Sequence, residues 1–377
     1  MEDNSIYHPK DVKDLDELGE LLGMNISMDR QIVPYATKNI VIAYGTFLTG
    51  VSAGLHITIL VALARLIGGG GMGLNKHLLA VFSASQLFSV LFVVPFEIAR
   101  EYLGHWYLGA TFCKIWITYS HLFIPAMLWS LLGLTLDKIY DLRSMGVYKY
   151  SKKNYKTAGI IACICLFTSV GLVPHQVWIH TKVEFVLVEV CAVIVDKPYT
   201  TILSFVFYFI PGALLLACLL GLVAYARHRV TQLTRAERQE SLTALDPRAR
   251  CRVHEEQCRT SHDVDTYISD IKNSCVCLCI LSFICVSMWS PFYAANLWLS
   301  HSRCENTFCF DPKLWALFQW IGYTSCLVCP CVVFIDKRVR GTVRYWLRLD
   351  IDDGEFSYKD SAVSKRRNSS DASTSLV

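Results

Sequence analysis

Long apolar runs without charged side chains are the feature that most constrains the fold of this chain. Residues 40–64 and 275–300 contain no Asp, Glu, Lys or Arg. A helix needs roughly 20 residues to cross the ~30 Å hydrocarbon layer of a bilayer, and one charge at its centre costs about 3 kcal/mol. With 53% hydrophobic and only 18% charged residues, the chain has more apolar sequence than one soluble core needs. We therefore expect an all-α membrane protein.

Seven stretches are long enough to cross the bilayer. They predict a seven-transmembrane helix bundle within residues 38–336, preceded by an extracellular segment at 1–37. A basic amphipathic helix on the inner leaflet is expected at 337–349, and a disordered, Ser-rich cytoplasmic tail at 350–377. The predicted spans are 40–66, 78–99, 114–136, 157–173, 200–226, 275–300 and 314–335.

The distribution of Lys and Arg sets the orientation. The first, third and fifth connections are basic, and the fifth forms a loop at about 227–272. Basic loops face the cytoplasm, so we expect a multi-pass plasma-membrane protein with its N-terminus outside. The first 37 residues are polar and acidic and do not resemble a cleavable signal peptide. Asn25, in Asn25-Ile26-Ser27, is then a candidate glycosylation site on the outer side.

The cysteines divide between two environments. Four of the 16 lie in predicted extracellular positions, where disulfides persist. We expect one disulfide between Cys113 and Cys191 and another between Cys304 and Cys309. The remaining cysteines lie in helices or the cytoplasm. For Cys275-Val-Cys277-Leu-Cys279, helix packing is a better interpretation than metal binding, because residues two apart on a helix do not face each other.

Motifs spread along the chain resemble those of rhodopsin-like (class A) G-protein-coupled receptors, over about residues 35–350. The chain is nearest in character to the peptide receptors of that family. The resemblance implies that Trp289, Pro291 and Pro330 take part in a conformational switch and that 337–349 is an eighth helix. The motifs are Trp106-x-x-Gly109-x-x-x-Cys113, Pro95, Pro211, Met288-Trp289-Ser290-Pro291-Phe292-Tyr293 and Cys329-Pro330.

Four departures from the family pattern lie in one polar cluster, which in relatives holds a sodium ion. The residues at these positions are His56, Gln86, Met127 and Cys329. A hard cation prefers carboxylate and other oxygen ligands, so we predict no sodium or other metal site. Gln86 either hydrogen-bonds His56 or the two side chains are satisfied separately, because an unpaired polar group at mid-membrane is costly.

The cytoplasmic switch also departs from the family pattern. Lys138 follows Asp137, where relatives have an arginine after the acidic residue. Lysine keeps the charge but lacks the planar fork of five donors. This change, together with Leu219 and Val333 in place of two tyrosines, puts coupling to a G protein in doubt while leaving the apolar pattern intact.

The outer side suggests the kind of ligand. Amine receptors of this family place an aspartate where this chain has Ser120, which argues against an amine. A β-hairpin is expected at 182–190 in the second outer loop, and Glu97, Arg100 and Glu101 suggest a basic peptide or small protein, although these charges would equally suit a solvated rim. Further candidate pocket residues are Tyr119, His121, Trp289 and Tyr293. For His121, a histidine satisfied by a neighbouring residue is an alternative to a ligand contact.

The predicted tail carries two short motifs. Ser369 and Ser370 follow a basic cluster and are candidate phosphorylation sites. Ser375-Leu376-Val377 has the form of a ligand for a PDZ domain.

The combined features predict a G-protein-coupled receptor of the cell membrane, active in neuropeptide signalling through a heterotrimeric G protein and arrestin. A capture or scaffolding protein on the same fold, without G-protein coupling, is the alternative. We expect no enzyme activity, because no catalytic constellation is visible. A transporter is not expected either, because no paired repeats with broken helices are visible. The prediction includes no cofactor and no nucleic-acid partner.

Overall fold

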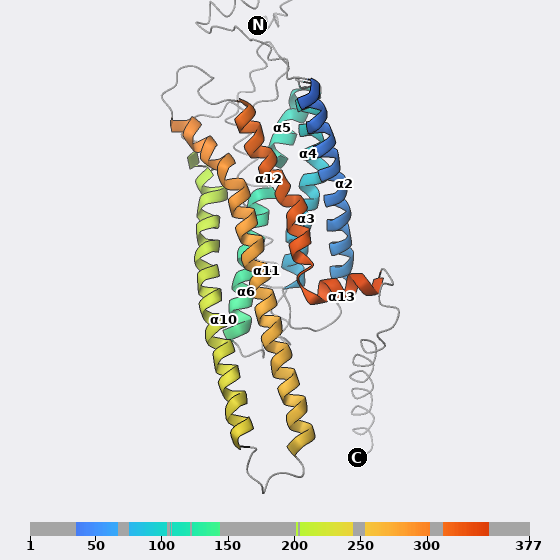
Figure 1. Ribbon diagram of the computed structural model, residues 1–377. Helices are drawn as coiled ribbons and strands as arrows, with labels where there is room; N and C mark the ends of the chain where they lie inside the picture. Colours follow the sequence, from blue (N-terminus) through green and yellow to red (C-terminus); the bar gives the residue numbers. More distant parts are fainter. Residues whose placement is uncertain are drawn as a thin grey trace, which may run out of the picture.

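The computed structural model describes residues 35–66, 75–103, 106, 108–120, 123–143, 201–202, 204–243, 253–301 and 312–346. Within these ranges the regular structure is helical (Figure 1). The helices are α2 (Tyr35–Leu66), α3 (Lys76–Phe92), α4 (Val94–Leu103), α5 (Gly109–Ser120), α6 (Phe123–Arg143), the π-helical turn η3 (Phe205–Phe209), α10 (Ile210–Thr243), α11 (Val253–His301), α12 (Pro312–Val333) and α13 (Lys337–Trp346).

Five helical segments in the described ranges are long and apolar enough to cross a membrane. They correspond to the predicted first, second, fifth, sixth and seventh spans. The third predicted span is divided between α5 and α6, and the fourth, at 157–173, lies outside the described residues. The five segments are Lys38–Leu66, Lys76–Leu103, Phe205–Gln239, Val264–Trp298 and Leu314–Val333.

Two prolines explain local breaks in these spans. The second span turns at Val93 between α3 and α4, just before Pro95, whose ring clashes with the carbonyl four residues earlier. In the fifth span, η3 precedes Pro211, and the Ile210 N–H bonds to the Phe205 carbonyl, five residues back. Both breaks therefore lie at prolines that belong to the motifs of the family resemblance.

The segment predicted as a loop at about 227–272 is mostly helical. α10 continues to Thr243 and α11 begins at Val253, so both extend well past the other helices at the lower end of Figure 1. Hydropathy marks only the part of a helix that lies in lipid. Residues 227–243 are rich in Arg, Glu, Gln and Leu, which favour helix in water as well, so the helices can continue into this connection, whose cytoplasmic position stays a prediction.

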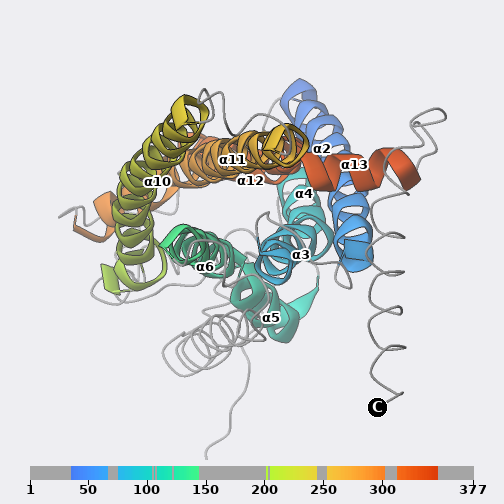
Figure 2. The ribbon, with the colours of Figure 1, turned by 90° about the horizontal axis from the view of Figure 1, so that it is seen from below.

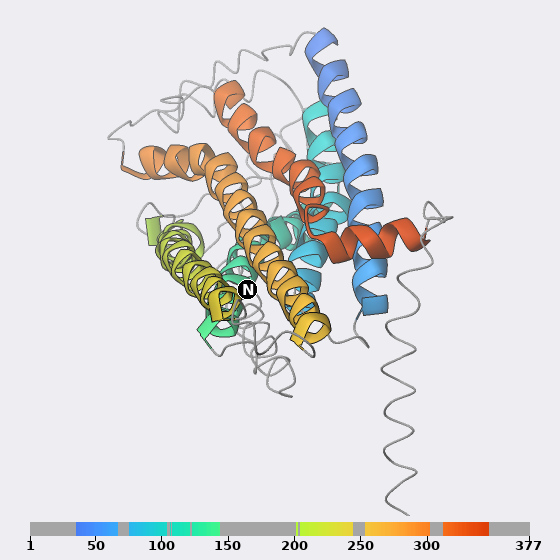
Figure 3. The same ribbon diagram turned by 60° about the horizontal axis from the view of Figure 1, so that its bottom comes forward.

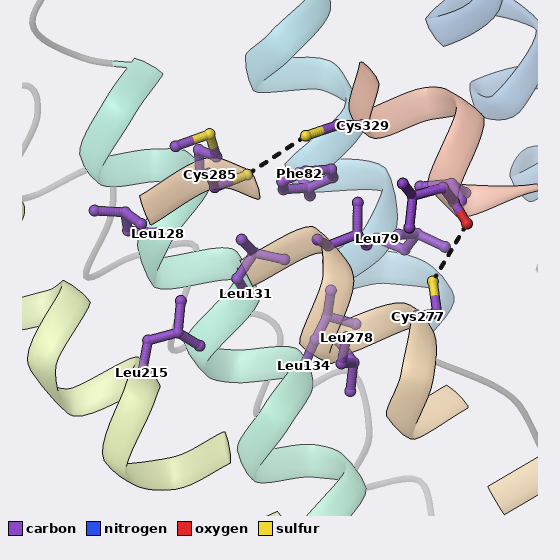
Figure 4. Packing of buried hydrophobic residues seen from close by; sticks show 14 of the residues in the cluster. Leu79, Phe82, Leu128, Leu131, Leu134, Leu215, Cys277, Leu278, Cys285 and Cys329 are labelled. Carbon is purple, nitrogen blue, oxygen red and sulfur yellow. Dashed lines mark hydrogen bonds between the residues drawn. The ribbon is translucent and has the colours of Figure 1, made fainter. Parts of the chain in front are cut away.

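The helices surround a common apolar core. α3 packs against α2 and α6, α10 packs on α6 and α11, and α12 packs on α11 and α2, which gives the ring seen end-on in Figure 2. Figure 4 shows the centre of this core, where leucines from α3, α6, α10 and α11 interdigitate. They include Leu79, Leu128, Leu131, Leu215 and Leu278, all fully or nearly fully buried.

The amphipathic segment after α12 forms α13 (Lys337–Trp346), and residues 347–349 of the predicted helix lie outside the described residues. Asp336 caps its start by accepting a hydrogen bond from the Val339 N–H at 3.3 Å, and such a cap satisfies a donor that the helix itself cannot. α13 contacts α2 and turns away from the axis of α12 (Figure 3). Its position on the inner leaflet stays a prediction.

Candidate functional site

Trp289 lies at the centre of an aromatic cluster joining three helices. Its side chain is 1% exposed, and its ring centroid lies 5.3 Å from that of Phe123 in α6 and 5.5 Å from that of Tyr323 in α12. The indole Nε1 donates to Ser325 Oγ at 3.2 Å. Gly322 leaves room for the ring, because a Cβ there would lie 2.7 Å from it. A movement of α11 must therefore disturb both α6 and α12.

Tyr293, one turn along α11 from Trp289, is also part of this cluster. Its ring stacks on Tyr208 with centroids 4.2 Å apart and an interplanar angle of 7°. The Tyr208 hydroxyl bonds to Ser290 Oγ at 2.7 Å and donates to the Val286 carbonyl. The η3–α10 segment is thus attached to α11 immediately before Pro291, where the helix lacks one backbone hydrogen bond.

A buried ionic group lies in α4. Glu97 is only 1% exposed and pairs with Arg100, which also reaches Glu101 at 3.1 Å. Both Glu97 and Arg100 interact electrostatically with the Tyr323 hydroxyl, so the group lies toward α12. Glu97 is therefore not part of a solvated rim, which was one of the two interpretations open from the sequence.

The other predicted pocket residues are not all brought together. Tyr119 is 42% exposed, and its ring contacts Phe88 of α3 with centroids 5.5 Å apart. Ser120 is the last residue of α5 and is half-buried. His121 lies outside the described residues. Of the predicted set, Trp289 and Tyr293 share one cluster, and Glu97 approaches it through Tyr323.

The motif around Trp106 builds the N-terminal end of the third span. Gly109 has φ of +74°, a conformation that residues with a side chain rarely adopt, and its carbonyl accepts from Trp106 Nε1 at 3.0 Å. Trp106 packs on Trp116 with centroids 5.1 Å apart. Cys113 is fully buried in this group and is disulfide-bonded.

Several residues expected to act on either side of the membrane lie outside the described residues. Pairing of Cys113 with Cys191 therefore stays a prediction, as does the disulfide between Cys304 and Cys309. The same holds for Asn25, Ser369 and Ser370, and for the β-hairpin at 182–190.

In the central polar cluster, His56 and Gln86 each have their own hydrogen-bond partners. His56 Nε2 donates to the Cys326 carbonyl at 3.0 Å, which leaves Nδ1 to accept from Ser83 Oγ at 2.9 Å. Gln86 instead donates to Met127 Sδ at 3.2 Å and accepts from Cys326 Sγ at 2.8 Å. The suggested His56–Gln86 hydrogen bond is wrong, because each side chain finds its partners on other helices. The absence of sodium binding stays a prediction.

Cysteines of α11 take part in the packing against α12. Cys285 Sγ and Cys329 Sγ lie 3.5 Å apart, and Cys277 Sγ donates to the Val332 carbonyl at 3.6 Å (Figure 4). Both cysteines of α11 are fully buried. These contacts support the packing interpretation of the Cys275-x-Cys277-x-Cys279 motif.

The charged group at the foot of α6 has an arrangement that the sequence did not predict. Lys138 is 2% exposed, and its Nζ lies 3.2 Å from Asp141 Oδ2, one turn further along. Asp137, just past the apolar run 114–136, accepts from Asn75 Nδ2 at 3.3 Å. Burial raises the pKa of Asp137 from its ordinary value of 3.8 to about 6. Lys138 is thus held by Asp141, and Asp137 joins α6 to the start of α3.

Comparisons with known proteins agree with this architecture. A family model described as "7 transmembrane receptor (rhodopsin family)" matches residues 74–332. The chain belongs to the rhodopsin family of seven-transmembrane receptors. The resemblance to the rhodopsin-like family is thereby confirmed, as are a multi-pass membrane protein and a family of receptors rather than enzymes, while the nearness to peptide receptors stays a prediction.

Curated relatives within the rhodopsin family are distant. Dopamine receptor 1 of Drosophila melanogaster is 21% identical over 272 residues, which cover 68% of this chain and 52% of the relative. 5-Hydroxytryptamine receptor 1B of Cavia porcellus is 22% identical over 293 residues, covering 68% and 73%. The D(1B) dopamine receptor of Xenopus laevis is 21% identical, covering 66% and 57%. The match thus spans about half the length of the fly receptor.

Sequence reasoning missed several residues of this rhodopsin-family site. Asp141 was predictable in principle, because it lies three residues after Lys138 and such pairs meet on a helix. Asn75 and Ser325 carried no local signal, because their partners lie on other helices far away in the sequence. Gln319 and Tyr323 are hydrogen-bonded to each other four residues apart on α12, a spacing at which side chains meet on a helix, so this pair was also predictable in principle.

Proposed function

We propose that this rhodopsin-family protein is a signalling receptor of the plasma membrane. An extracellular ligand binds near the outer ends of α4, α11 and α12, α11 rearranges around Pro291, and a cleft for a heterotrimeric G protein opens at the inner ends of α6, α10 and α11. One observation carries the proposal. Trp289 is enclosed between α6 and α12 on a helix that has Pro291 within it and extends without interruption to Val253 at the inner side.

The ligand that we propose is a peptide or small protein with a basic group. Ser120 stands where a helix-three carboxylate would bind an amine, whereas Glu97 supplies a buried carboxylate from α4. The relatives named for dopamine and 5-hydroxytryptamine favour a second candidate, a small amine. Both candidates share a cationic group, so a ligand screen must include both.

Nucleotide exchange in cell membranes tests the receptor function. Wild-type protein is exposed to a library of basic peptides and to a panel of monoamines, and GDP release from coexpressed G proteins is measured. A ligand that accelerates exchange in wild-type membranes should lose this effect in the Trp289→Leu variant. Phe283→Leu is the matched control, because Phe283 lies on the same helix, away from its outer end, and is 69% exposed.

A capture protein would give a different result. It would bind a peptide or amine and reach the cell surface, yet show no exchange with any G protein in any variant. That result would contradict the receptor proposal. Recruitment of arrestin after phosphorylation of Ser369 and Ser370, and of a PDZ protein to the last residues, completes the proposal and is measured in the same cells.

A further inference from the structure

Two buried oxygen atoms near the outer ends of α4 and α12 lack a hydrogen-bond donor. Among the described residues, Glu97 Oε2 and Gln319 Oε1 have no partner, although the side chains are only 1% and 8% exposed. Buried oxygens of this kind are rarely left unsatisfied in proteins, because desolvation without a compensating hydrogen bond is unfavourable. These two acceptor oxygens could therefore receive hydrogen bonds from a bound ligand.

Both side chains interact with the same hydroxyl group. Gln319 Nε2 donates to the Tyr323 hydroxyl at 3.0 Å, and Glu97 interacts electrostatically with that hydroxyl. Ile98, next to Glu97, and Trp320, next to Gln319, would both contact a Cβ placed at Gly45, so the two acceptors lie where α4 and α12 approach each other. Trp320, whose ring centroid lies 5.8 Å from that of Tyr323, adds a second aromatic ring.

The charge of this group favours a cation. Glu97 and Glu101 both approach Arg100, so two carboxylates face one guanidinium and one negative charge is left over. Arg100 Nη2 contacts both carboxylates, while its Nε has no acceptor among the described residues. If Glu97 or Glu101 rotated to accept from Arg100 Nε, that donor would be satisfied. The excess negative charge would remain, and Gln319 Oε1 would still lack a donor.

We propose that Glu97 and Gln319 form a binding subsite for the cationic group of the ligand. Glu97 Oε2 is the counter-ion, Gln319 Oε1 is the second acceptor, and the group bound is a protonated ammonium or a guanidinium. The carboxylate comes from α4 and replaces the one that Ser120 cannot supply. This inference rests on the proposed receptor function, because it assumes a ligand arriving from the outer side. The cation enters by displacing the side chains that cover Glu97.

Thermal unfolding of the purified, full-length protein tests this subsite. The probes are 2-phenylethylammonium, as the monoamine, and phenylalanyl-arginine amide, as the basic peptide, each at millimolar concentration and pH 7. 2-Phenylethanol is the neutral analogue of the first probe. We expect at least one cationic probe to raise the unfolding temperature of the wild-type protein, whereas the alcohol does not. The probe that acts distinguishes a small amine from a basic peptide.

Variants assign the effect to the two acceptors. Glu97→Gln should weaken the apparent affinity of the active probe by about tenfold or more, and Gln319→Leu by several-fold, because charge-assisted hydrogen bonds are strong when buried. Glu97→Asp should retain part of the binding. Glu101→Gln removes the second carboxylate of the ionic group at a more exposed position, so it should weaken the affinity less than Glu97→Gln does. Asp265→Asn is the control, because Asp265 is an exposed carboxylate of α11 outside this group, and it should leave the affinity unchanged.

A second variant guards against loss of the fold. If Glu97→Gln alone does not fold, the triple variant Glu97→Gln/Arg100→Gln/Glu101→Gln removes the whole ionic group, leaves no unpaired charge there and should fold without binding the cation. Equal affinities of wild-type protein and these variants would overturn the inference, as would the absence of any stabilisation by both cations. If an internal water already donates to the two oxygens, neither cation should stabilise the protein. Because the readout is unfolding and not nucleotide exchange, either failure leaves the test of receptor function standing.

Discussion

The thiols of Cys285 in α11 and Cys329 in α12 lie 3.5 Å apart, both fully buried. We predict that a membrane-permeant diazene oxidant such as diamide joins them. The two thiols lose two hydrogens and two electrons to the N=N bond, and a disulfide and a hydrazine form. The linkage should raise the unfolding temperature, because it restrains the unfolded chain.

Mass spectrometry of linked peptides and thermal unfolding measure this effect. Cys329→Ala should abolish both changes. Cys277→Ala should abolish neither, since Cys277 bonds to the Val332 carbonyl instead. A diamide-treated wild-type protein with both thiols still free would show that the two side chains do not approach each other in the membrane.

Gly322→Ala tests the packing of Trp289. A Cβ at this position would lie 2.7 Å from the indole ring, so the ring must shift in a core without spare room. We expect a loss of about 1–3 kcal/mol in the free energy of unfolding, measured by thermal or denaturant unfolding. Gly54→Ala in α2 is the control, because a Cβ there meets nothing within 4 Å. Equal stability of the two variants would contradict the placement of Trp289.

Lys138→Ala tests the cytoplasmic group. It removes one partner of the buried pair with Asp141, which we expect to cost about 3 kcal/mol and to abolish ligand-stimulated nucleotide exchange. Lys138→Arg should preserve or raise exchange, because guanidinium provides bidentate donors. The double variant Lys138→Ala/Asp141→Ala should be more stable than Lys138→Ala alone. Robust exchange in all three variants would assign the switch to another residue.

Asp137 predicts a pH dependence of stability. Because burial raises its folded-state pKa to about 6, the folded state holds a proton that the unfolded state releases at lower pH. Stability therefore falls as pH rises through roughly 4 to 6. Asp137→Asn should flatten this part of the profile and raise the unfolding temperature above pH 6, while its side-chain oxygen can still accept from Asn75. The exposed Asp265 of α11 provides the control, Asp265→Asn, whose profile should follow that of the wild-type protein.

Cys113→Ala tests the outer disulfide. Cys113 is disulfide-bonded within the Trp106 group, and we expect its loss to cost about 2–5 kcal/mol and to reduce delivery to the cell surface. Surface labelling and thermal unfolding measure the two effects. Cys191→Ala should match Cys113→Ala if the predicted pairing is right, whereas Cys218→Ala, at a free cysteine of α10, should have little effect.

The helices were predictable because lipid imposes a strict length and polarity on every crossing. The charge-free runs at 40–64 and 275–300 lie within α2 and α11. The polar extensions of α10 and α11 were not predictable on this criterion, since a helix in water needs no apolar run.

The candidate site was less predictable than the fold. Trp289 and Pro291 were predicted through a family motif, which places them in the helix regardless of their neighbours. The partners of Gln86 and Asp137 lie on other helices and depend on which helices face each other, whereas Glu97 and Lys138 pair with residues three positions further along their own helices. The burial of Glu97 also depends on helix packing, so the sequence left its role open and did not identify Gln319.

Because α11 is long, a small tilt near Pro291 produces a large displacement at its far end. Val253 lies 38 residues before Pro291 within one continuous helix, a distance of about 57 Å at a rise of roughly 1.5 Å per residue. A tilt of only about 5° at the proline would carry the inner end sideways by about 5 Å, roughly one helical turn. The pivot is near Trp289, so a displacement of about half an ångström close to the ring would be magnified some tenfold at the inner end, where a cytoplasmic partner could detect it.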